Sequence, residues 1–364
     1  MPAQDVALVK QWIQSGSLLH PFEQPRTIIN VAKDACSYPD YSVALIILDG
    51  LGLELFNSVL GSSSFLQRHF KETVSSVFPA TTAAALTSIA TGLSPGEHGI
   101  LGWTLYDGNI LFNPLPWMNE ETRSPLKDEV DPREVFKFPS MMGSCQAKVR
   151  TSLSAYSDSH FTRATCRGMN RMHCSSEDLG EALTKLGRIW KKNPAGSFTY
   201  IYCRQPDGLE HQHGPDSPEV AKLVHKVDRQ LGDFWELSGN RKRKIFITAD
   251  HGQILGEDIF PEIKSCVMSV EARSPAFFVK PGFSRDEAET ELRDRLPGWA
   301  VLTADEVEEL GLLGSTLSAQ AREQLGDFFC LTISREIIGP SMQKGVHGGM
   351  TPMEMRVPFC FAED

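Results

Sequence analysis

Three apolar segments that each lead to an aspartate constrain the fold of this chain more than any other feature. The pairs are residues 43–48 with Asp49, residues 199–203 with Asp207, and residues 244–249 with Asp250. Short apolar runs without polar alternation are typical of strands buried on both faces, as in parallel sheets. Ligands bind at the carboxyl edge of such a sheet, so we expect the three aspartates to lie together there.

Helical patterns lie between these predicted strands, which favours an α/β fold with a mainly parallel central sheet. Residues 217–235 open with Ser217 as a predicted N-cap and continue with apolar residues at helical spacing. Residues 5–15 and 83–90 also have helical patterns, the second ending before Gly92. We expect one domain over residues 1–364, with an inserted cap segment over 104–195 and short amphipathic helices within 284–335.

Charge and apolar content exclude several classes of protein. The formal net charge of −10 argues against broad electrostatic binding of nucleic acid and against a polybasic membrane-surface protein. The chain has no apolar run approaching the ~18 residues of a membrane span. Its eight cysteines form no CxxC pair, which indicates reduced thiols rather than a zinc ribbon, and the N-terminus resembles no signal peptide. We therefore predict a cytoplasmic protein.

Imidazoles accompany the three aspartates and complete a potential ligand set. The six candidate ligands are Asp49, Asp207, His211, Asp250, His251 and His347. A single aspartate after a strand often caps a helix, and a single histidine beside glycines is more often a turn residue. Together, three carboxylates and three imidazoles match the needs of a two-metal site. Zinc accepts both nitrogen and oxygen ligands, and carboxylates also suit manganese.

The predicted helix over 83–90 begins directly after two threonines, Thr81 and Thr82. One of them could serve only as an N-cap. Alternatively, a threonine hydroxyl at a helix N-terminus meets free N–H groups and the positive end of the helix dipole, a place that suits phosphate. A metal beside that hydroxyl would lower its pKa and make it a nucleophile.

The order of these residues resembles that of the alkaline phosphatase superfamily, and more narrowly its nucleotide pyrophosphatase/phosphodiesterase branch. The matching blocks are Ile47-Leu-Asp-Gly-Leu-Gly52, Phe78-Pro-Ala-Thr-Thr82, Thr91-Gly-Leu-Ser-Pro-Gly-Glu-His-Gly99, Gln205-Pro-Asp-Gly-Leu-Glu-His-Gln-His-Gly-Pro215, Thr248-Ala-Asp-His-Gly252 and Val346-His-Gly-Gly349. The blocks span residues 43–350. The resemblance implies a three-layer α/β/α sandwich of the alkaline phosphatase type.

The resemblance also implies a role for each candidate residue. One zinc ion would be held by Asp207, His211 and His347. A second would be held by Asp49, Asp250, His251 and the nucleophile. Counting back from Thr91-Gly92, the nucleophile falls on Thr82, with Thr81 as second choice. His98 matches a motif position with a structural role, and His213 matches no ligand position.

One position departs from the family pattern. The phosphodiesterase branch has an asparagine that binds a phosphoryl oxygen, and Trp103 stands there in this chain. Tryptophan offers one N–H and cannot replace an amide, so another donor would have to bind that oxygen, such as the Thr82 N–H or an arginine from the insert. Trp103 and Tyr106 are candidates to line the substrate pocket, although packing in a lid or core would explain them equally well.

The resemblance predicts a metal-dependent hydrolase that cleaves phosphodiester or pyrophosphate bonds of a small molecule such as a nucleotide. A covalent phospho-threonine would form on Thr82. Alternatives are a phosphomonoesterase or phosphonate hydrolase using the same site, a manganese-dependent phosphomutase, and a non-catalytic metal-binding module. The phosphomutases use a serine nucleophile, which Thr81 and Thr82 argue against. The oligomeric state is left open.

Overall fold

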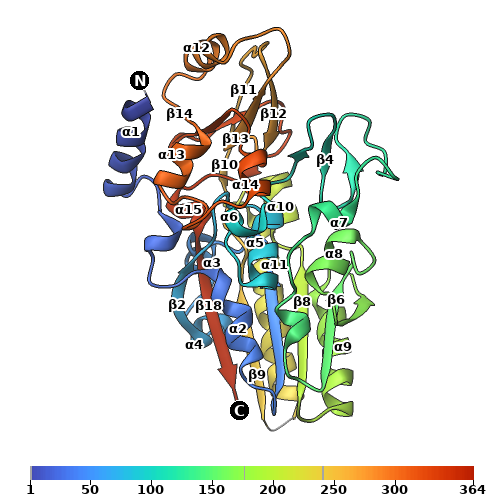
Figure 1. Ribbon diagram of the computed structural model, residues 1–364. Helices are drawn as coiled ribbons and strands as arrows, with labels where there is room; N and C mark the ends of the chain where they lie inside the picture. The colour runs from blue at the N-terminus through green and yellow to red at the C-terminus, as the bar shows by residue number, and fades with distance from the viewer. Residues whose placement is uncertain (1, 176, 240–241) are drawn as a thin grey trace.

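The computed structural model describes residues 2–175, 177–239 and 242–364 (Figure 1). Its centre is a seven-stranded sheet in the order β2-β18-β9-β1-β8-β6-β7. The strands are β1 (Ser42–Leu48), β2 (Phe70–Ser75), β6 (Val149–Ser154), β7 (Asn170–His173), β8 (Ser197–Cys203), β9 (Arg243–Thr248) and β18 (Arg356–Glu363). Strands β9, β1, β8, β6 and β7 run parallel, and β18 runs antiparallel to both β9 and β2.

Helices cover both faces of this sheet, which is why its central strands carry apolar side chains on both sides (Figure 1). Every residue of β1, β8 and β9 is buried. In one group of helices, α11 (Pro218–Leu237) contacts α3 (Leu53–Val59), α4 (Phe65–His69) and α9 (Leu179–Lys192). A second group is α2 (Val31–Cys36), α5 (Thr82–Thr91) and α8 (His160–Thr165). The predicted fold, a three-layer sandwich with a mainly parallel sheet, is confirmed.

The predicted helices are present with small shifts at their ends. Helix α11 is capped by Ser217, whose hydroxyl accepts a hydrogen bond from the Val220 N–H. Helix α5 is buried at all its positions and ends at Gly92, which has a left-handed φ of 74°. The first helix, α1, spans Pro2–Gln14. Within the described ranges, no helix is both long enough and apolar enough to cross a membrane.

The C-terminal third forms a second sheet beside the first, which the sequence patterns did not predict. Its four strands are antiparallel, in the order β12-β13-β15-β14. The elements of this region are β12 (Cys266–Val270), β13 (Pro275–Val279), α12 (Arg285–Arg295), β14 (Ala300–Leu302), α13 (Ala304–Glu309), α14 (Ala319–Gln324) and β15 (Phe328–Leu331). The short amphipathic helices predicted within 284–335 are present, and this sheet contributes to two apolar clusters separate from the main core.

The segment 104–195, predicted to be an insert, is divided by the sheet into two parts. Its first part forms a small sheet of β3 (Leu105–Tyr106), β4 (Leu111–Asn113) and β5 (Met118–Asn119), then α7 (Pro132–Val135). Its second part supplies β6, β7 and α9 to the central sandwich. The predicted segment 104–195 therefore includes part of the central sandwich as well as the small sheet. Strands β6 and β7 contain Arg150, Thr151, Asn170 and Arg171, so they lack the apolar run that marks a central strand.

Short elements complete the wall around the carboxyl edge of the central sheet. They are α6 (Pro95–His98), α10 (Asp207–His213), β10 (Ile254–Leu255), β11 (Glu257–Ile259), β16 (Glu336–Ile338), β17 (Gly345–Val346) and α15 (Pro352–Met355). Strand β10 pairs with β17, and β11 pairs with β16. This pairing brings His347, directly after β17, to the region where β1, β8 and β9 end.

Candidate active site

The loops that follow β1, β8 and β9 are joined to one another by hydrogen bonds whose donors are backbone N–H groups. The Asp49 N–H donates to the Cys203 carbonyl at 3.0 Å, and the Asp207 N–H donates to the Asp49 carbonyl at 2.9 Å. The Gly50 N–H donates to Oδ1 of Asp250 at 3.2 Å. Gly50 has a φ of +81°, and a Cβ there would lie 2.8 Å from Cα of Asp207. These contacts bring the three aspartates together at the predicted edge.

The six predicted ligands meet at this edge in two overlapping groups. Asp207, His251 and His347 place ligand atoms within 4.8 Å of one another, and so do Asp49, Asp250 and His251. Nε2 of His211 lies 3.2 Å from Oδ1 of Asp207 and joins the first group through it. Because His251 stacks on His347 at a centroid distance of 3.8 Å, the two groups form one cluster.

Each histidine of the cluster is held by its Nδ1 atom and presents Nε2 to the centre. The Nδ1 atoms of His211, His251 and His347 lie 2.8, 3.2 and 3.0 Å from the backbone carbonyls of Gly345, Gly252 and Ala80. A carbonyl only accepts, so these contacts fix the proton on Nδ1 and leave a lone pair on Nε2. This orientation is typical of imidazoles that bind metal ions.

Two of the aspartates have oxygens that find no donor among the described residues. Oδ1 of Asp49 and Oδ2 of Asp250 are buried without a hydrogen-bond partner, and Oδ2 of Asp49 accepts from the Tyr202 hydroxyl. Burial, reinforced by the neighbouring aspartates, raises the pKa of Asp49 well above its ordinary value and the pKa of Asp250 to about 6. Buried carboxylates this close together require a positive partner, so the cluster fits a divalent cation.

Burial has the opposite effect on the imidazoles. It lowers the pKa of His251 to about 4 and the pKa of His347 to about 3, so both rings are neutral near pH 7 and able to bind metal. Burial also acts on Asp207 and His211, but their mutual attraction outweighs it. The pKa of Asp207 is therefore lowered, and the pKa of His211 is raised.

The two candidate nucleophiles differ in what their hydroxyls contact. Thr81 precedes α5, and its hydroxyl donates to Oε1 of Glu271 at 2.6 Å. Thr82 is the first residue of α5, and its Oγ1 lies 3.2 Å from Nε2 of His251. Neither hydroxyl caps the helix. The hydroxyl of Thr82 therefore belongs to the ligand cluster, whereas that of Thr81 is bound in a separate contact.

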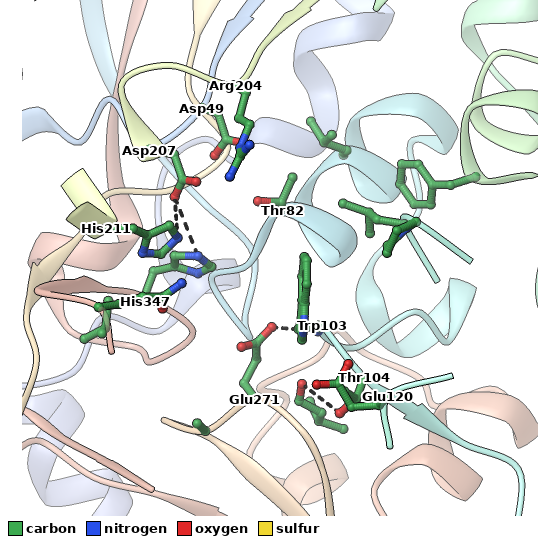
Figure 2. A pocket seen from close by; sticks show the side chains of 18 of the residues that line it. Asp49, Thr82, Trp103, Thr104, Glu120, Arg204, Asp207, His211, Glu271 and His347 are labelled. Atoms are coloured by element: carbon green, nitrogen blue, oxygen red, sulfur yellow. Dashed lines mark hydrogen bonds and ion pairs between the residues drawn. The ribbon is translucent and has the colours of Figure 1, made fainter. Parts of the chain in front are cut away.

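A cavity of about 650 Å³ opens in front of the cluster. Figure 2 shows Thr82 between the cluster residues Asp49, Asp207, His211 and His347 on one side and Trp103 on the other. Apolar and aromatic side chains form much of the remaining wall; they include Leu86, Leu111, Leu115, Tyr156, Phe161 and Met268. The cavity is large enough for a small organic ligand whose reacting group lies beside Thr82.

The family model of type I phosphodiesterase / nucleotide pyrophosphatase matches residues 43–263, more than half of the chain. The chain belongs to this family. Among curated relatives, human bis(5'-adenosyl)-triphosphatase ENPP4 is 23% identical over 261 residues, which cover 65% of this chain and 53% of that protein. Venom phosphodiesterase 2 of Crotalus adamanteus is 27% identical over 182 residues, covering 48% of this chain and 22% of the relative. The chain thus spans about half or less of these relatives.

Two solved structures have a similar fold. Human ectonucleotide pyrophosphatase/phosphodiesterase 5 superposes with a TM-score of 0.70 at 17% identity, covering 88% of this chain and 87% of that one. Phosphonoacetate hydrolase from Sinorhizobium meliloti 1021 in complex with phosphonoacetate superposes with a TM-score of 0.62 at 18% identity, covering 90% and 91%. The fold predicted from the sequence motifs is therefore that of this family.

Of the two predicted pocket residues, the structure places one in the cavity. Trp103 lines it and is 44% exposed, while its backbone N–H donates to Oε1 of Glu271 at 2.7 Å. Tyr106 is outside the residues that line this cavity. Its ring packs on Phe278, and its hydroxyl donates to the Gly108 carbonyl at 2.8 Å. The prediction of a substrate contact for Tyr106 is therefore not supported; the packing alternative describes it.

The structure adds residues that the sequence patterns did not single out. Glu271 links Thr81 to Trp103, Tyr202 donates to Asp49, and Arg204 lines the cavity beside Asp207. Tyr202 lies near the end of β8 and Arg204 directly follows this strand, so both are close in sequence to the predicted ligand Asp207. Glu271 lies in no motif. His98 is buried, with Nε2 at 2.9 Å from the Ser88 hydroxyl, and His213 is exposed, so neither joins the cluster.

Proposed function

We propose that the protein is a metal-dependent hydrolase of phosphate esters that uses Thr82 as its nucleophile. One observation carries the proposal: a threonine hydroxyl at the start of a buried helix lies 3.2 Å from Nε2 of His251, inside a cluster of six ligand-type side chains, at the wall of a cavity. The relatives named phosphodiesterase and triphosphatase support the reaction class.

The donor set supports two divalent cations. Asp207, His211 and His347 would hold one, and Asp49, Asp250, His251 and Thr82 the other. When bound, such ions stabilise negative charge on the attacking and departing oxygens. Three imidazole nitrogens favour zinc, while the three carboxylates keep manganese as the alternative. The unpartnered oxygens of Asp49 and Asp250 are the structural feature that fits the ions.

The chain's own groups supply the nucleophile and its orientation. Oγ1 of Thr82 forms a bond to phosphorus as the bond to the leaving oxygen breaks, and its proton passes through solvent to that oxygen. Thr82 is the first residue of α5, so the free N–H groups at the start of this helix would attract the phosphoryl group. Water then hydrolyses the threonine phosphate ester, which restores the hydroxyl and releases the product. A murine relative solved with AMP is a threonine-to-alanine variant described as inactive, which supports this role.

Phosphodiester or pyrophosphate bonds of a small molecule such as a nucleotide are the preferred substrates, in line with the family. A phosphonate or phosphate monoester is the second candidate. Two observations favour it: the likeness to phosphonoacetate hydrolase, and Trp103 at the position where the branch has a phosphoryl-binding asparagine. The cytoplasmic location and the absence of broad nucleic-acid binding remain predictions from the sequence.

The substrate class is tested with the purified protein and three kinds of compound: aryl phosphate monoesters, aryl phosphodiesters and dinucleoside polyphosphates. We expect the highest kcat/KM on one of the last two. Higher activity on the monoester would favour the second candidate. No turnover of any of them by protein that holds stoichiometric zinc would contradict hydrolysis and favour the non-catalytic module.

A further inference from the structure

Arg204 is a cationic side chain in the cavity with no part in the proposed reaction so far. Among the described residues that line the cavity, it is the one arginine or lysine, whereas four of the lining residues carry carboxylates: Asp49, Glu120, Asp207 and Glu271. Figure 2 shows Arg204 on the same side of Thr82 as Asp49 and Asp207, and both Arg204 and Thr82 line the cavity. A positive charge in that space is available to an anionic ligand.

The ion pairs around Arg204 leave its charge available. Among the described residues, Arg204 forms an ion pair with Glu177, with 3.7 Å between Nη1 and Oε1. Both side chains are about half exposed. Exposed pairs at this distance are weak. The ion-pair partners of Asp49 and Asp207 are instead histidines of the cluster, so Arg204 is not their counter-ion.

The local backbone gives the guanidinium room to reach the cavity. Arg204 directly follows β8 and precedes Asp207 by three residues, at the same edge of the sheet as the cluster. Gly208 lies against the Arg204 side chain: a Cβ at position 208 would be 3.4 Å from Nε of Arg204. The side chain is thus placed on the rigid end of a central strand, next to a ligand residue.

We propose that Arg204 binds the non-bridging oxygens of the phosphoryl group that Thr82 attacks. The inference rests on the proposed function. A guanidinium presents donors in a planar fork that matches a phosphoryl group, which an ammonium or an indole does not. Arg204 thereby supplies the oxygen-binding donor that Trp103 cannot supply. It approaches from the strand side of Thr82, whereas Trp103 lies on the opposite side (Figure 2).

This placement makes Arg204 sensitive to the charge of the substrate. A phosphate monoester carries up to two negative charges over three non-bridging oxygens, and a diester carries one over two. A fork of donors therefore gains more from the monoester. Removing it has the larger effect on monoesters, and it also weakens the binding of inorganic phosphate.

The experiment compares the wild type with Arg204→Ala and Arg204→Lys on nitrophenyl phosphate and phenyl nitrophenyl phosphate, which share a leaving group. Arg188→Ala, an exposed position of α9, is the matched control. Inorganic phosphate binding is measured by calorimetry, and metal content is measured for every variant. We expect Arg204→Ala to lower kcat/KM on the monoester roughly 10- to 100-fold, in line with loss of a hydrogen bond to a charged group.

The same substitution should weaken phosphate binding by a similar factor and reduce diester hydrolysis less. Arg204→Lys should recover part of the loss, and Arg188→Ala should change neither quantity. Values for Arg204→Ala within about two-fold of the wild type on both substrates and on phosphate would overturn the role of Arg204. A wild type that neither hydrolyses these esters nor binds phosphate would instead overturn the proposed function.

Discussion

The two sides of the cavity are built in different ways. The ligand cluster lies on loops at the ends of three buried parallel strands, and hydrogen bonds donated by backbone N–H groups join those loops. The opposite side, which includes Trp103 and Glu120, comes from the small sheet and the loops around it. Asp49 is 1% exposed and Trp103 is 44% exposed. The proposed reacting groups are thus held by buried strands, whereas the surface proposed to meet the leaving group belongs to a less buried segment.

Among these predictions, Thr82→Ala should have the largest effect on activity. It tests whether the reaction takes place at the ligand cluster. The variant lacks the proposed nucleophile, so hydrolysis should fall by about 10³-fold or more, while metal content is retained. Steady-state rates and metal analysis check this. Thr81→Ala is the matched control because its hydroxyl contacts Glu271 rather than the cluster. Near wild-type activity in Thr82→Ala would exclude Thr82 as the nucleophile.

Removal of bound metal tests the role of the ligand cluster without changing any residue. Chelation should abolish activity and lower the melting temperature, because Asp49 and Asp250 then face each other without a cation. Zinc should restore both quantities better than magnesium, which prefers oxygen ligands in octahedral geometry. Calorimetry and turnover after back-titration measure this. Full recovery with magnesium alone would contradict the zinc assignment.

The loop that carries His347 depends on a buried ion pair. Nε of Arg273 lies 2.8 Å from Oε1 of Glu354, both side chains are fully buried, and Glu354 also accepts from the Gly349 N–H. Arg273→Met leaves an uncompensated buried carboxylate and should cost about 3–5 kcal/mol of unfolding free energy. Lys10→Met breaks the exposed pair with Glu309 and should cost about 1 kcal/mol or less. Urea unfolding measures the loss of unfolding free energy in both variants. Equal losses in Arg273→Met and Lys10→Met would contradict this explanation.

The contrast between the ligand cluster and the rest of the structure also explains which parts of the fold and the site could be predicted from the sequence. The cluster side was predictable because three apolar runs fix the strands and each ends at an aspartate. His347 was predictable from the family motif and lies outside the matched segment 43–263. The second sheet, β6 and β7 were missed because their strands are short or polar. Glu271 was missed because its role depends on tertiary contacts with Thr81 and Trp103, which no local pattern records.

On the side of the cavity opposite the ligand cluster, Trp103→Ala should have a moderate effect on substrate binding. An exposed indole in the cavity can pack against an aryl or base leaving group, so KM should rise about 2- to 10-fold with little change in kcat. Michaelis–Menten kinetics on an aryl phosphodiester measure both constants. Tyr106→Ala is the control, because its ring packs on Phe278 outside the cavity. An unchanged KM in Trp103→Ala would show that the leaving group binds elsewhere.

Glu271 connects the two sides, and its ionisation provides the smallest predicted effect. Burial raises the pKa of this carboxyl to about 7, although the hydrogen bonds from Thr81 and the Trp103 N–H favour the charged form. The unfolded carboxyl, with an ordinary pKa of 4.5, is ionised at both pH 5 and pH 8. The folded carboxyl is protonated at about pH 5 and ionised at about pH 8.

A group whose pKa is raised on folding contributes stability at low pH that is lost as the pH rises through the folded value. Glu271→Gln keeps an acceptor for Thr81 and Trp103 and cannot ionise. In the presence of chelator, the variant should therefore melt near the wild-type temperature at about pH 5 and a few degrees above it at about pH 8. Thermal scans across this range test it. If the difference in melting temperature between Glu271→Gln and the wild type did not change with pH, Glu271 would already be ionised at low pH. The carboxyl that links Thr81 to Trp103 would then be charged throughout this range.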